Sequence, residues 1–230
     1  HWGYFLIGFS VLFIGLQFLK DSLPDISSNP ELLAKLSSYT TMGYASVLIF
    51  MVIGTLLTLI LQSSSATMAL TLLMTFEGWI PFEMAAAMVL GENIGTTITA
   101  NLAALIANYQ AKRAARAHLI FNLMGVVWMG ILFYPFLSLI DMLVIKIEGF
   151  SPFVYTASIP VALSLFHTLF NIINTSVLLC FVTVIARIVE RMVPEVEEAT
   201  EKMTLAEPKY LNESSLEYPQ TGIKAMFDES

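Results

Sequence analysis

Long stretches without a charged residue constrain the fold of this chain more than any other feature. Asp, Glu, Lys and Arg are absent from residues 3–19, 42–76, 93–111, 117–140 and 149–186. A helix needs about 20 mostly apolar residues to cross the roughly 30 Å hydrocarbon core of a bilayer, and several of these stretches are long enough. We therefore predict an all-α, polytopic membrane protein.

The composition excludes several other classes of protein. Of 230 residues, 57% are hydrophobic and 13% are charged, against about 45–50% and about 25% in ordinary soluble domains. Residues 190–230 hold ten acids and four bases, so they carry most of the net charge of -7. The remainder lacks the basic excess of a nucleic-acid-binding protein. A single cysteine, Cys180, excludes a disulfide framework and a cysteine-based zinc site.

The apolar stretches predict two kinds of helix. Spanning helices are expected at residues 44–61, 117–140 and 159–186, with a marginal one at residues 3–19. Between residues 62 and 108, polar clusters and a turn at 77–81 leave shorter apolar pieces at 66–76, 82–90 and 98–108. Each piece covers roughly 15 Å at about 1.5 Å per residue, so we predict half-helices and discontinuous spans.

Helix breaks at membrane depth indicate a site, because such backbone must be buried in protein or line a water-filled cavity. Ser63–Ser65 can cap the helix at 66–76, and Thr96 or Thr97 can cap the helix at 98–108. Two interior helix N-termini suit an anion, and the unwound carbonyls and hydroxyls suit sodium. The alternative is that Ser, Thr and Gly serve only close helix packing.

Two motifs carry a resemblance to a known family. The sequences QSSSAT at residues 62–67 and GENIGTT at residues 91–97 resemble the paired signatures of type II sodium/phosphate cotransporters, including bacterial members. HLIFN at 118–122 and HTLFN at 167–171 look like later helices of that family. The resemblance implies two inverted repeats, each with a re-entrant QSSS hairpin, and binding of phosphate and sodium where the repeats meet.

The chain holds one QSSS motif where the family has two. We expect residues 1–191 to be one transmembrane repeat and residues 192–230 to be an acidic cytoplasmic tail. Pro208–Leu211 and Pro219 in that tail resemble the start of a PhoU-like region. The second repeat would lie in the same polypeptide or in another copy of the chain, and the start at His1 rather than Met favours the first arrangement.

The resemblance implies sodium-coupled phosphate transport by alternating access in the bacterial inner membrane. The expected partners are inorganic phosphate, sodium, the lipid bilayer and the second repeat, with no nucleic acid. Sodium would be the coupling ion, with no cofactor and no enzymatic activity. Two alternatives stay open: a membrane subunit that assembles without transporting, and an intramembrane serine hydrolase, which lacks a G-x-S-x-G motif.

The candidate site must bind phosphate with neutral groups, because Lys and Arg are absent between residues 38 and 111. Sodium would supply the positive charge, so each ion would raise the affinity of the other. The candidate phosphate-binding residues are Ser63, Ser64, Ser65, Asn93, Thr96 and Thr97. The candidate sodium-binding residues are Gln62, Ser64, Ser65, Glu92, Asn93 and Thr96. For Glu92, bonding to loop amides is an equal alternative.

Polar residues on two later helices complete the prediction. Helical spacing puts one face of the last span inward, formed by Ser164, His167, Thr168, Asn171, Asn174 and Thr175. We expect four residues to support the site through hydrogen bonds between helices rather than as direct ligands, namely His118, Asn122, His167 and Asn171. No metal other than sodium is expected, since no third ligand accompanies the histidines.

The basic residues predict the orientation. Lys112, Arg113 and Arg116 precede one span, and Arg187 and Arg191 follow the last. The positive-inside rule places both groups in the cytoplasm. The loop at residues 141–151 would then face outside and the tail inside.

Overall fold

The computed structural model describes residues 1–22, 30–195, 223–224 and 227. Their contacts divide the chain into one unit at His1–Val193 and another at Pro194–Ser230. The predicted tail therefore lies mostly outside the described residues. The α-helices of the first unit are α1 (Trp2–Asp21), α2 (Pro30–Thr40), α3 (Tyr44–Leu61), α4 (Ser64–Phe76), α5 (Phe82–Ala103), α6 (Tyr109–Ile131), α7 (Phe133–Glu148), α8 (Ile159–Leu179) and α9 (Val182–Met192). The described residues also form two 3-10 turns, Ala104–Ile106 and Thr156–Ser158.

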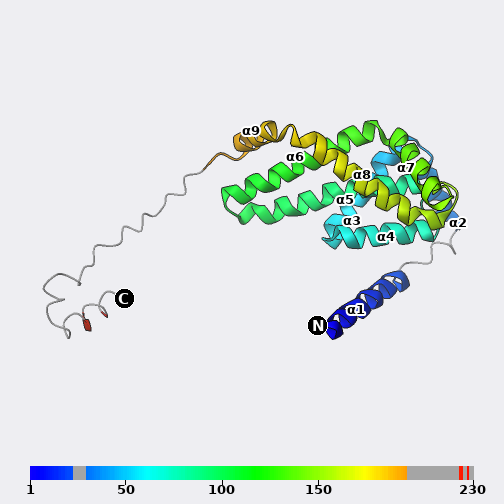
Figure 1. Ribbon diagram of the computed structural model, residues 1–230, viewed down its shortest axis with the longest axis horizontal. Coiled ribbons are helices and arrows are strands. Elements are labelled where there is room, and N and C mark those ends of the chain that lie inside the picture. The colour runs from blue at the N-terminus through cyan, green and yellow to red at the C-terminus, as the bar shows by residue number, and fades with distance from the viewer. Residues whose placement is uncertain (23–29, 196–222, 225–226, 228–230) are drawn as a thin grey trace. The chain divides into compact units, whose positions relative to one another are not determined.

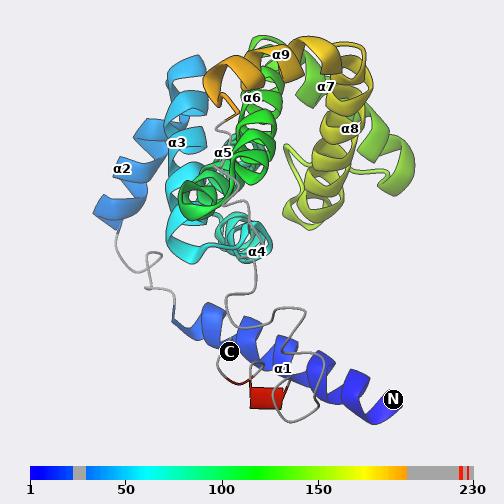
Figure 2. The same ribbon diagram turned by 90° about the vertical axis from the view of Figure 1, so that its left-hand side faces the viewer.

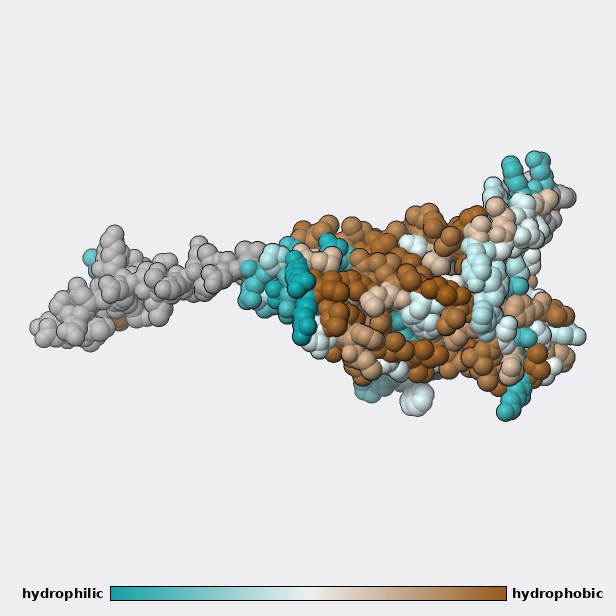
Figure 3. All heavy atoms as spheres, turned by 90° about the horizontal axis from the view of Figure 1, so that it is seen from above, coloured by the Kyte–Doolittle hydropathy of each residue, from teal (hydrophilic) through white to brown (hydrophobic). Residues whose placement is uncertain are grey.

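The predicted all-α membrane class is confirmed. Among the described residues, four helices are long and apolar enough to cross a bilayer, which are α1, α3, α6 and the segment Thr156–Leu179 that contains α8. Large apolar side chains cover their outer faces, for example Val127, Ile131 and Ile172, which are all more than half exposed. In Figure 3 the visible surface of the helical part is accordingly mostly hydrophobic. Lipid is the solvent that suits such a surface.

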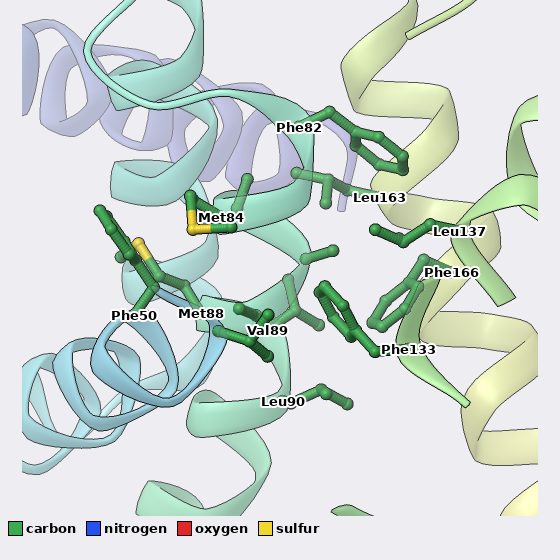
Figure 4. Packing of buried hydrophobic residues seen from close by; sticks show 14 of the residues in the cluster. Phe50, Phe82, Met84, Met88, Val89, Leu90, Phe133, Leu137, Leu163 and Phe166 are labelled. Atoms are coloured by element: carbon green, nitrogen blue, oxygen red, sulfur yellow. The ribbon is translucent and has the colours of Figure 1, made fainter. Parts of the chain in front are cut away.

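Helix α5 is the central element of the unit. It contacts α3 and α4 on one side and α6 and α8 on the other (Figure 1), and its residues 84–91 are almost wholly buried. In Figure 4, Met84 and Met88 lie beside Phe50 of α3, and Phe82 lies beside Leu163 of α8. The second view (Figure 2) shows α6 and α8 side by side with α9 near one end of each. The core therefore forms around α5.

The break predicted at residues 91–97 is wrong, because α5 runs through these residues without interruption. Gly91 and Gly95 are one helical turn apart and face α3, as in the small-residue packing of membrane helices. A Cβ atom on Gly91 would overlap the carbonyl oxygen of Met51, and one on Gly95 would lie 2.6 Å from Cβ of Thr58. The glycines thus allow two helix backbones to touch.

Without that break, the half-helices predicted at 82–90 and 98–108 are also wrong, and Thr96 and Thr97 cap nothing. The Thr96 hydroxyl donates to the carbonyl of Glu92 at 2.8 Å, and that of Thr97 to the carbonyl of Ile94 at 2.7 Å. Both hydroxyls are therefore satisfied within their own helix, as Ser and Thr commonly are inside helices.

The break predicted at the QSSS motif is confirmed. Helix α3 ends at Leu61, and Gln62 adopts the left-handed conformation with φ 52°. Ser63 is the N-cap of α4, and its hydroxyl oxygen accepts a hydrogen bond from the amide of Ala66 at 3.2 Å. Helix α4 has 13 residues and rises about 20 Å, too little to cross a bilayer. The re-entrant placement of this hairpin in a membrane stays a prediction.

The boundaries of two predicted spans need correction. The span at 117–140 divides at Leu132 into α6 and α7, because Pro135 suits the first turn of a new helix but would break the interior of an old one. Helix α7 then continues to Glu148, where a loop was predicted. The span at 159–186 ends at Leu179, and the amphipathic α9 packs Ile185 and Val189 against α6.

Candidate functional site

A polar cavity of about 500 Å³ lies between α4, α5, α6 and α8. Its lining consists of Ser64, Ser65, Met68, Glu92, Asn93, Thr96, His118, Phe121, Asn122, His167 and Asn171. Nine of these are candidate residues from the two motifs and the two later helices. The structure therefore brings together groups that are up to about a hundred positions apart in the sequence.

Three candidate residues lie outside this lining. Gln62 forms the exposed left-handed joint between α3 and α4. Ser63 uses its hydroxyl oxygen to cap α4. Thr97 is buried on another face of α5. The geometry gives these three a structural role and leaves the other nine beside the cavity.

The first turn of α4 presents hydrogen-bond donors to the cavity. Ser64 and Ser65 line it and are exposed, and the first N–H groups of a helix have no partner within the helix. The caps from Ser63 satisfy the amides of Ala66 and Thr67. The N-terminal end of a helix carries about half a positive charge. This wall of the cavity therefore suits an anion.

Glu92 of α5 adds a carboxylate to the lining of the cavity. Its side chain is 3% exposed, and Oε1 accepts a hydrogen bond from the hydroxyl of Thr71 at 3.0 Å. Lys and Arg are absent from the described lining of the cavity. A buried carboxylate without a basic partner needs a cation or a proton to balance it. This part of the lining therefore suits a cation.

Three asparagine side chains of the lining donate hydrogen bonds from their NH₂ groups to backbone carbonyls, and this fixes the direction of their amide oxygens. Nδ2 of Asn122 donates to the carbonyl of Asn93 at 3.1 Å and lies 3.3 Å from Nε2 of His118. Nδ2 of Asn93 donates to the carbonyl of Val89, and Nδ2 of Asn171 to that of His167. The amide oxygens are thus left as acceptors, which a hard cation prefers.

The polar face predicted on the last span divides in two. His167 and Asn171 line the cavity, whereas Asn174 is buried against α6, where it accepts from Nε1 of Trp128 at 3.0 Å. The inward placement predicted for the other residues is wrong, because Ser164, Thr168 and Thr175 are exposed. At 3.6 residues per turn these six positions cover about 120° of the helix, with Asn174 and His167 toward one edge and Thr168 at the other, and only the first edge faces the interior.

Sequence reasoning missed the buried threonines of α4. Thr67, Thr71 and Thr75 are each at most 3% exposed and face the interior of the unit. The hydroxyl of Thr58 on α3 lies 3.2 Å from that of Thr67, and Thr71 reaches Glu92. The spacing i, i+4, i+8 is the signal that could have found them, because it puts three hydroxyls on one face of an apolar helix.

These features define a helical membrane protein with a polar interior cavity, the architecture of a membrane transporter. The match with a family model is specific. Residues 30–135 match the model of the Na+/Pi-cotransporter family. The resemblance inferred from the two motifs is thus confirmed at the level of the family.

Individual relatives agree with the family. The chain is 34% identical over 144 residues to "Uncharacterized protein YqeW" of Bacillus subtilis (strain 168), which covers 63% of this chain and 43% of that protein. It is 27% identical over 219 residues to "Putative inorganic phosphate export protein YjbB" of Escherichia coli (strain K12). This match covers 94% of this chain and 36% of that protein. It is 43% identical over 98 residues to "Sodium-dependent phosphate transport protein 2B" of Homo sapiens. This match covers 40% of this chain and 13% of that protein.

The chain thus spans less than half the length of each of these relatives. The family and the relatives named for an activity are transport proteins rather than enzymes, so the expectation of a non-enzyme is confirmed. No solved structure gives a significant match.

Proposed function

We propose that this chain is one repeat of a sodium-coupled phosphate transporter that works by alternating access around the cavity between α4, α5, α6 and α8. The observation that carries the proposal is the pairing of a helix N-terminus with a buried carboxylate across one cavity that has no Lys or Arg in its described lining. A cavity of this kind has a place for an anion and a place for a cation.

Phosphate would bind at the α4 side of the cavity. The hydroxyls of Ser64 and Ser65 and the first N–H groups of α4 are donors at fixed positions, which a tetrahedral oxyanion requires. Thr96 and Asn93 line the same space. These neutral donors cannot compensate a full negative charge by themselves, so phosphate binding would depend on a cation.

Sodium would bind near Glu92 and the amide oxygens. The Glu92 carboxylate, the Asn93 amide and the Thr96 hydroxyl are oxygen groups one to four positions apart on one turn of α5. A cation placed there lies between the carboxylate and the phosphate, where it relieves their repulsion. Each ion then raises the affinity of the other, which is the thermodynamic basis of coupling.

A second repeat would complete the site. The cavity opens to the surface at Ser64, Ser65 and His118, and the exposed hydroxyls of Thr168 and Thr175 continue along α8. Exposed polar groups on a membrane helix favour contact with protein or water over lipid. A second QSSS repeat, in the same polypeptide or in another copy, is the partner that supplies these contacts.

The same proposal includes the placement in the membrane. The basic residues at the start of α6 and in α9 support a cytoplasmic position for those ends, in a bacterial inner membrane. The transmembrane repeat would comprise residues 1–191. Residues 192–230 would form the acidic cytoplasmic tail and the start of a PhoU-like region.

The test is the sodium dependence of phosphate binding. Full-length protein in membranes is titrated with labelled phosphate in sodium buffer and in choline buffer of equal ionic strength. We expect binding to weaken at least about tenfold in choline, because about 1.4 kcal/mol corresponds to tenfold and couplings of 1–3 kcal/mol are typical. Equal affinity in the two buffers would exclude a shared cavity.

The direction of net flux needs a separate measurement, because the names of two relatives describe export and sodium-dependent transport. Membrane vesicles loaded with phosphate and vesicles placed in phosphate are compared under the same sodium gradient. The coupling proposed here requires that reversing the gradient reverses the net phosphate movement. Net phosphate movement whose direction does not depend on the sodium gradient would contradict the proposed coupling.

A further inference from the structure

A second cavity of about 490 Å³ lies at the other end of α4, and the motifs do not account for it. It is lined by Thr75 at the end of α4, by Trp79 and Phe82 at the turn into α5, and by Thr40 of α2. Phe153 and Thr156 ahead of α8 form the remaining wall. We refer to it as the Trp79 cavity, and to the first as the serine cavity.

The two cavities are arranged along the same two helices, α4 and α5. Helix α4 contributes Ser64 to the serine cavity and Thr75 to the Trp79 cavity, so the two lie near its opposite ends. Helix α5 contributes Phe82 to one and Glu92 to the other, a separation of about 15 Å along the helix axis. This distance is about half the hydrocarbon thickness of a bilayer. The two cavities thus lie at different depths.

Buried threonines of α4 lie between the two cavities. Thr71 and Thr75 are one helical turn apart on α4, and Thr75 lines the Trp79 cavity. The hydroxyl of Thr71 lies 3.0 Å from Oε1 of Glu92, which lines the serine cavity, and 2.9 Å from the carbonyl oxygen of Thr67. A hydroxyl has one hydrogen to donate. Thr71 can therefore give it to Glu92 or to its own helix.

The neighbouring side of α5 is apolar over the same distance. Residues 84–90 of α5 are Met, Ala, Val and Leu, and all are buried. An ion that passed between the cavities there would lose its hydration with nothing to replace it. The hydroxyl-bearing face of α4 is the side that offers oxygen atoms in steps of one helical turn.

Trp79 lines the second cavity and carries a buried donor beside it. Its side chain is 8% exposed, and its Nε1 atom has no hydrogen-bond partner among the described residues. A buried N–H without an acceptor costs about 1–3 kcal/mol, so the local packing that encloses this atom is less stable than one in which it is paired. Threonine hydroxyls share the lining, and Lys and Arg are absent from its described part. A neutral polar lining of this kind fits hydrated ions in transit rather than tight binding of one ion.

We propose that the Trp79 cavity is the second mouth of the transport route and that Thr71 and Thr75 form the polar step between it and the serine cavity. This inference rests on the proposed function. The Trp79 cavity admits hydrated phosphate and sodium from the external side, where the positive-inside rule puts the segment before α8. The serine cavity communicates with the cytoplasmic side. Movement of the Thr71 hydroxyl between Glu92 and Thr67 accompanies passage of the cation.

The experiment is a two-sided labelling of single cysteines in the full-length protein. In a Cys180→Ser background, Thr75→Cys, Thr156→Cys and Ser65→Cys are each exposed to a membrane-impermeant thiol reagent. Intact cells present the external side and inverted vesicles present the cytoplasmic side, and labelling is measured by mass spectrometry. We expect Thr75→Cys and Thr156→Cys to react from outside and Ser65→Cys to react from inside.

Phosphate uptake after labelling distinguishes a residue in the cavity wall from a residue on the exposed surface beside it. Labelling of Thr156→Cys should lower phosphate uptake about tenfold or more, the ratio produced by about 1.4 kcal/mol, because the added group fills the cavity. The matched control is Glu77→Cys, on the exposed turn next to Trp79 but outside the lining. Its labelling from outside should leave uptake unchanged.

The outcomes distinguish this inference from the proposed function. Labelling of Thr156→Cys and Ser65→Cys from the same side overturns the two-mouth arrangement, and so does full uptake after Thr156→Cys is labelled. Thr71→Val should lower uptake about tenfold, and Thr71→Ser should restore it; equal uptake in both overturns the polar step. Absence of sodium-dependent uptake in the unlabelled parent protein is instead a failure of the proposed function.

Discussion

The QSSS segment and the GENIGTT segment have similar compositions and opposite structures. Both combine small and polar residues within an apolar region, and both line the serine cavity. The first ends one helix and starts another, whereas the second lies inside a continuous helix. The difference lies in the glycines, which are absent from the first segment and spaced four apart in the second.

Glycines at that spacing serve contact between helices rather than a change of direction. Gly91 and Gly95 have helical backbone conformations and face α3, and the hydroxyl of Thr55 lies 3.0 Å from the carbonyl of Gly91. In the QSSS segment, three consecutive hydroxyl side chains compete with the helix for backbone amides, and Ser63 becomes a cap. Side-chain hydroxyls thus break the helix in one motif, and missing side chains hold two helices together in the other.

The largest effect is expected from Gly91→Ala. The added Cβ would overlap the backbone of Met51, so α3 and α5 would have to separate at a cost of about 1–3 kcal/mol or more. Gly130→Ala is the matched control, because it lies in α6 with nothing within 4 Å of its Cβ position. It should stabilise the helix by up to about 1 kcal/mol. Thermal unfolding of the two variants in detergent measures the difference, and similar stabilities would mean that α3 and α5 do not touch there.

Next in size is the effect of Glu92→Gln, which keeps the shape and removes the charge. If the carboxylate binds sodium, the sodium concentration for half-maximal uptake should rise about tenfold. If Glu92 only organises α5 through Thr71, uptake should keep its sodium dependence. Uptake against sodium is measured at two pH values, with Glu77→Gln on the exposed turn as control. Superimposable curves for wild type and Glu92→Gln would assign the residue to the structural role.

A smaller effect separates neighbouring serines of the QSSS segment. Ser63→Ala removes a cap and should lower stability by about 1 kcal/mol, with little direct effect on affinity. Ser64→Ala and Ser65→Ala should do the reverse, since these side chains line the cavity and do not cap the helix. Unfolding temperature and phosphate affinity are measured for all three. Loss of stability alone in every variant would return the serines to a packing role.

The smallest effect is expected from Thr97→Val. The Thr97 hydroxyl is buried and donates to its own helix, away from the cavity, so sodium-dependent uptake should stay within about twofold of wild type, or roughly 0.4 kcal/mol. Thr96→Val removes a hydroxyl that lines the cavity and should weaken binding more. A greater loss in Thr97→Val than in Thr96→Val would contradict the lining described here.

The sequence could predict the lining of the serine cavity better than the helix boundaries. Charge-free length is sufficient to predict membrane helices, and hydroxyl clusters together with Asn and His at helical spacing are sufficient to select most of the cavity lining. The role of Gly91 could not be predicted, because it depends on which helix lies opposite, and α3 is distant in sequence. Pro135 was a usable signal for the division between α6 and α7, whereas the division after Leu179 has no Gly or Pro to mark it.

The contact between α3 and α5 also decides where this protein can bend. Backbones in direct contact behave as one rigid body, because sliding them would drive glycine positions against side chains. Helix α4 is joined to that body by Gln62 at one end and Gly78 at the other, and both have positive φ. Rotation about these two joints would leave the helical hydrogen bonds intact. The structure thus combines a rigid frame of α3 and α5 with a short helix, α4, that is joined through two residues with positive φ and carries Ser64 and Ser65 of the serine cavity at its first turn.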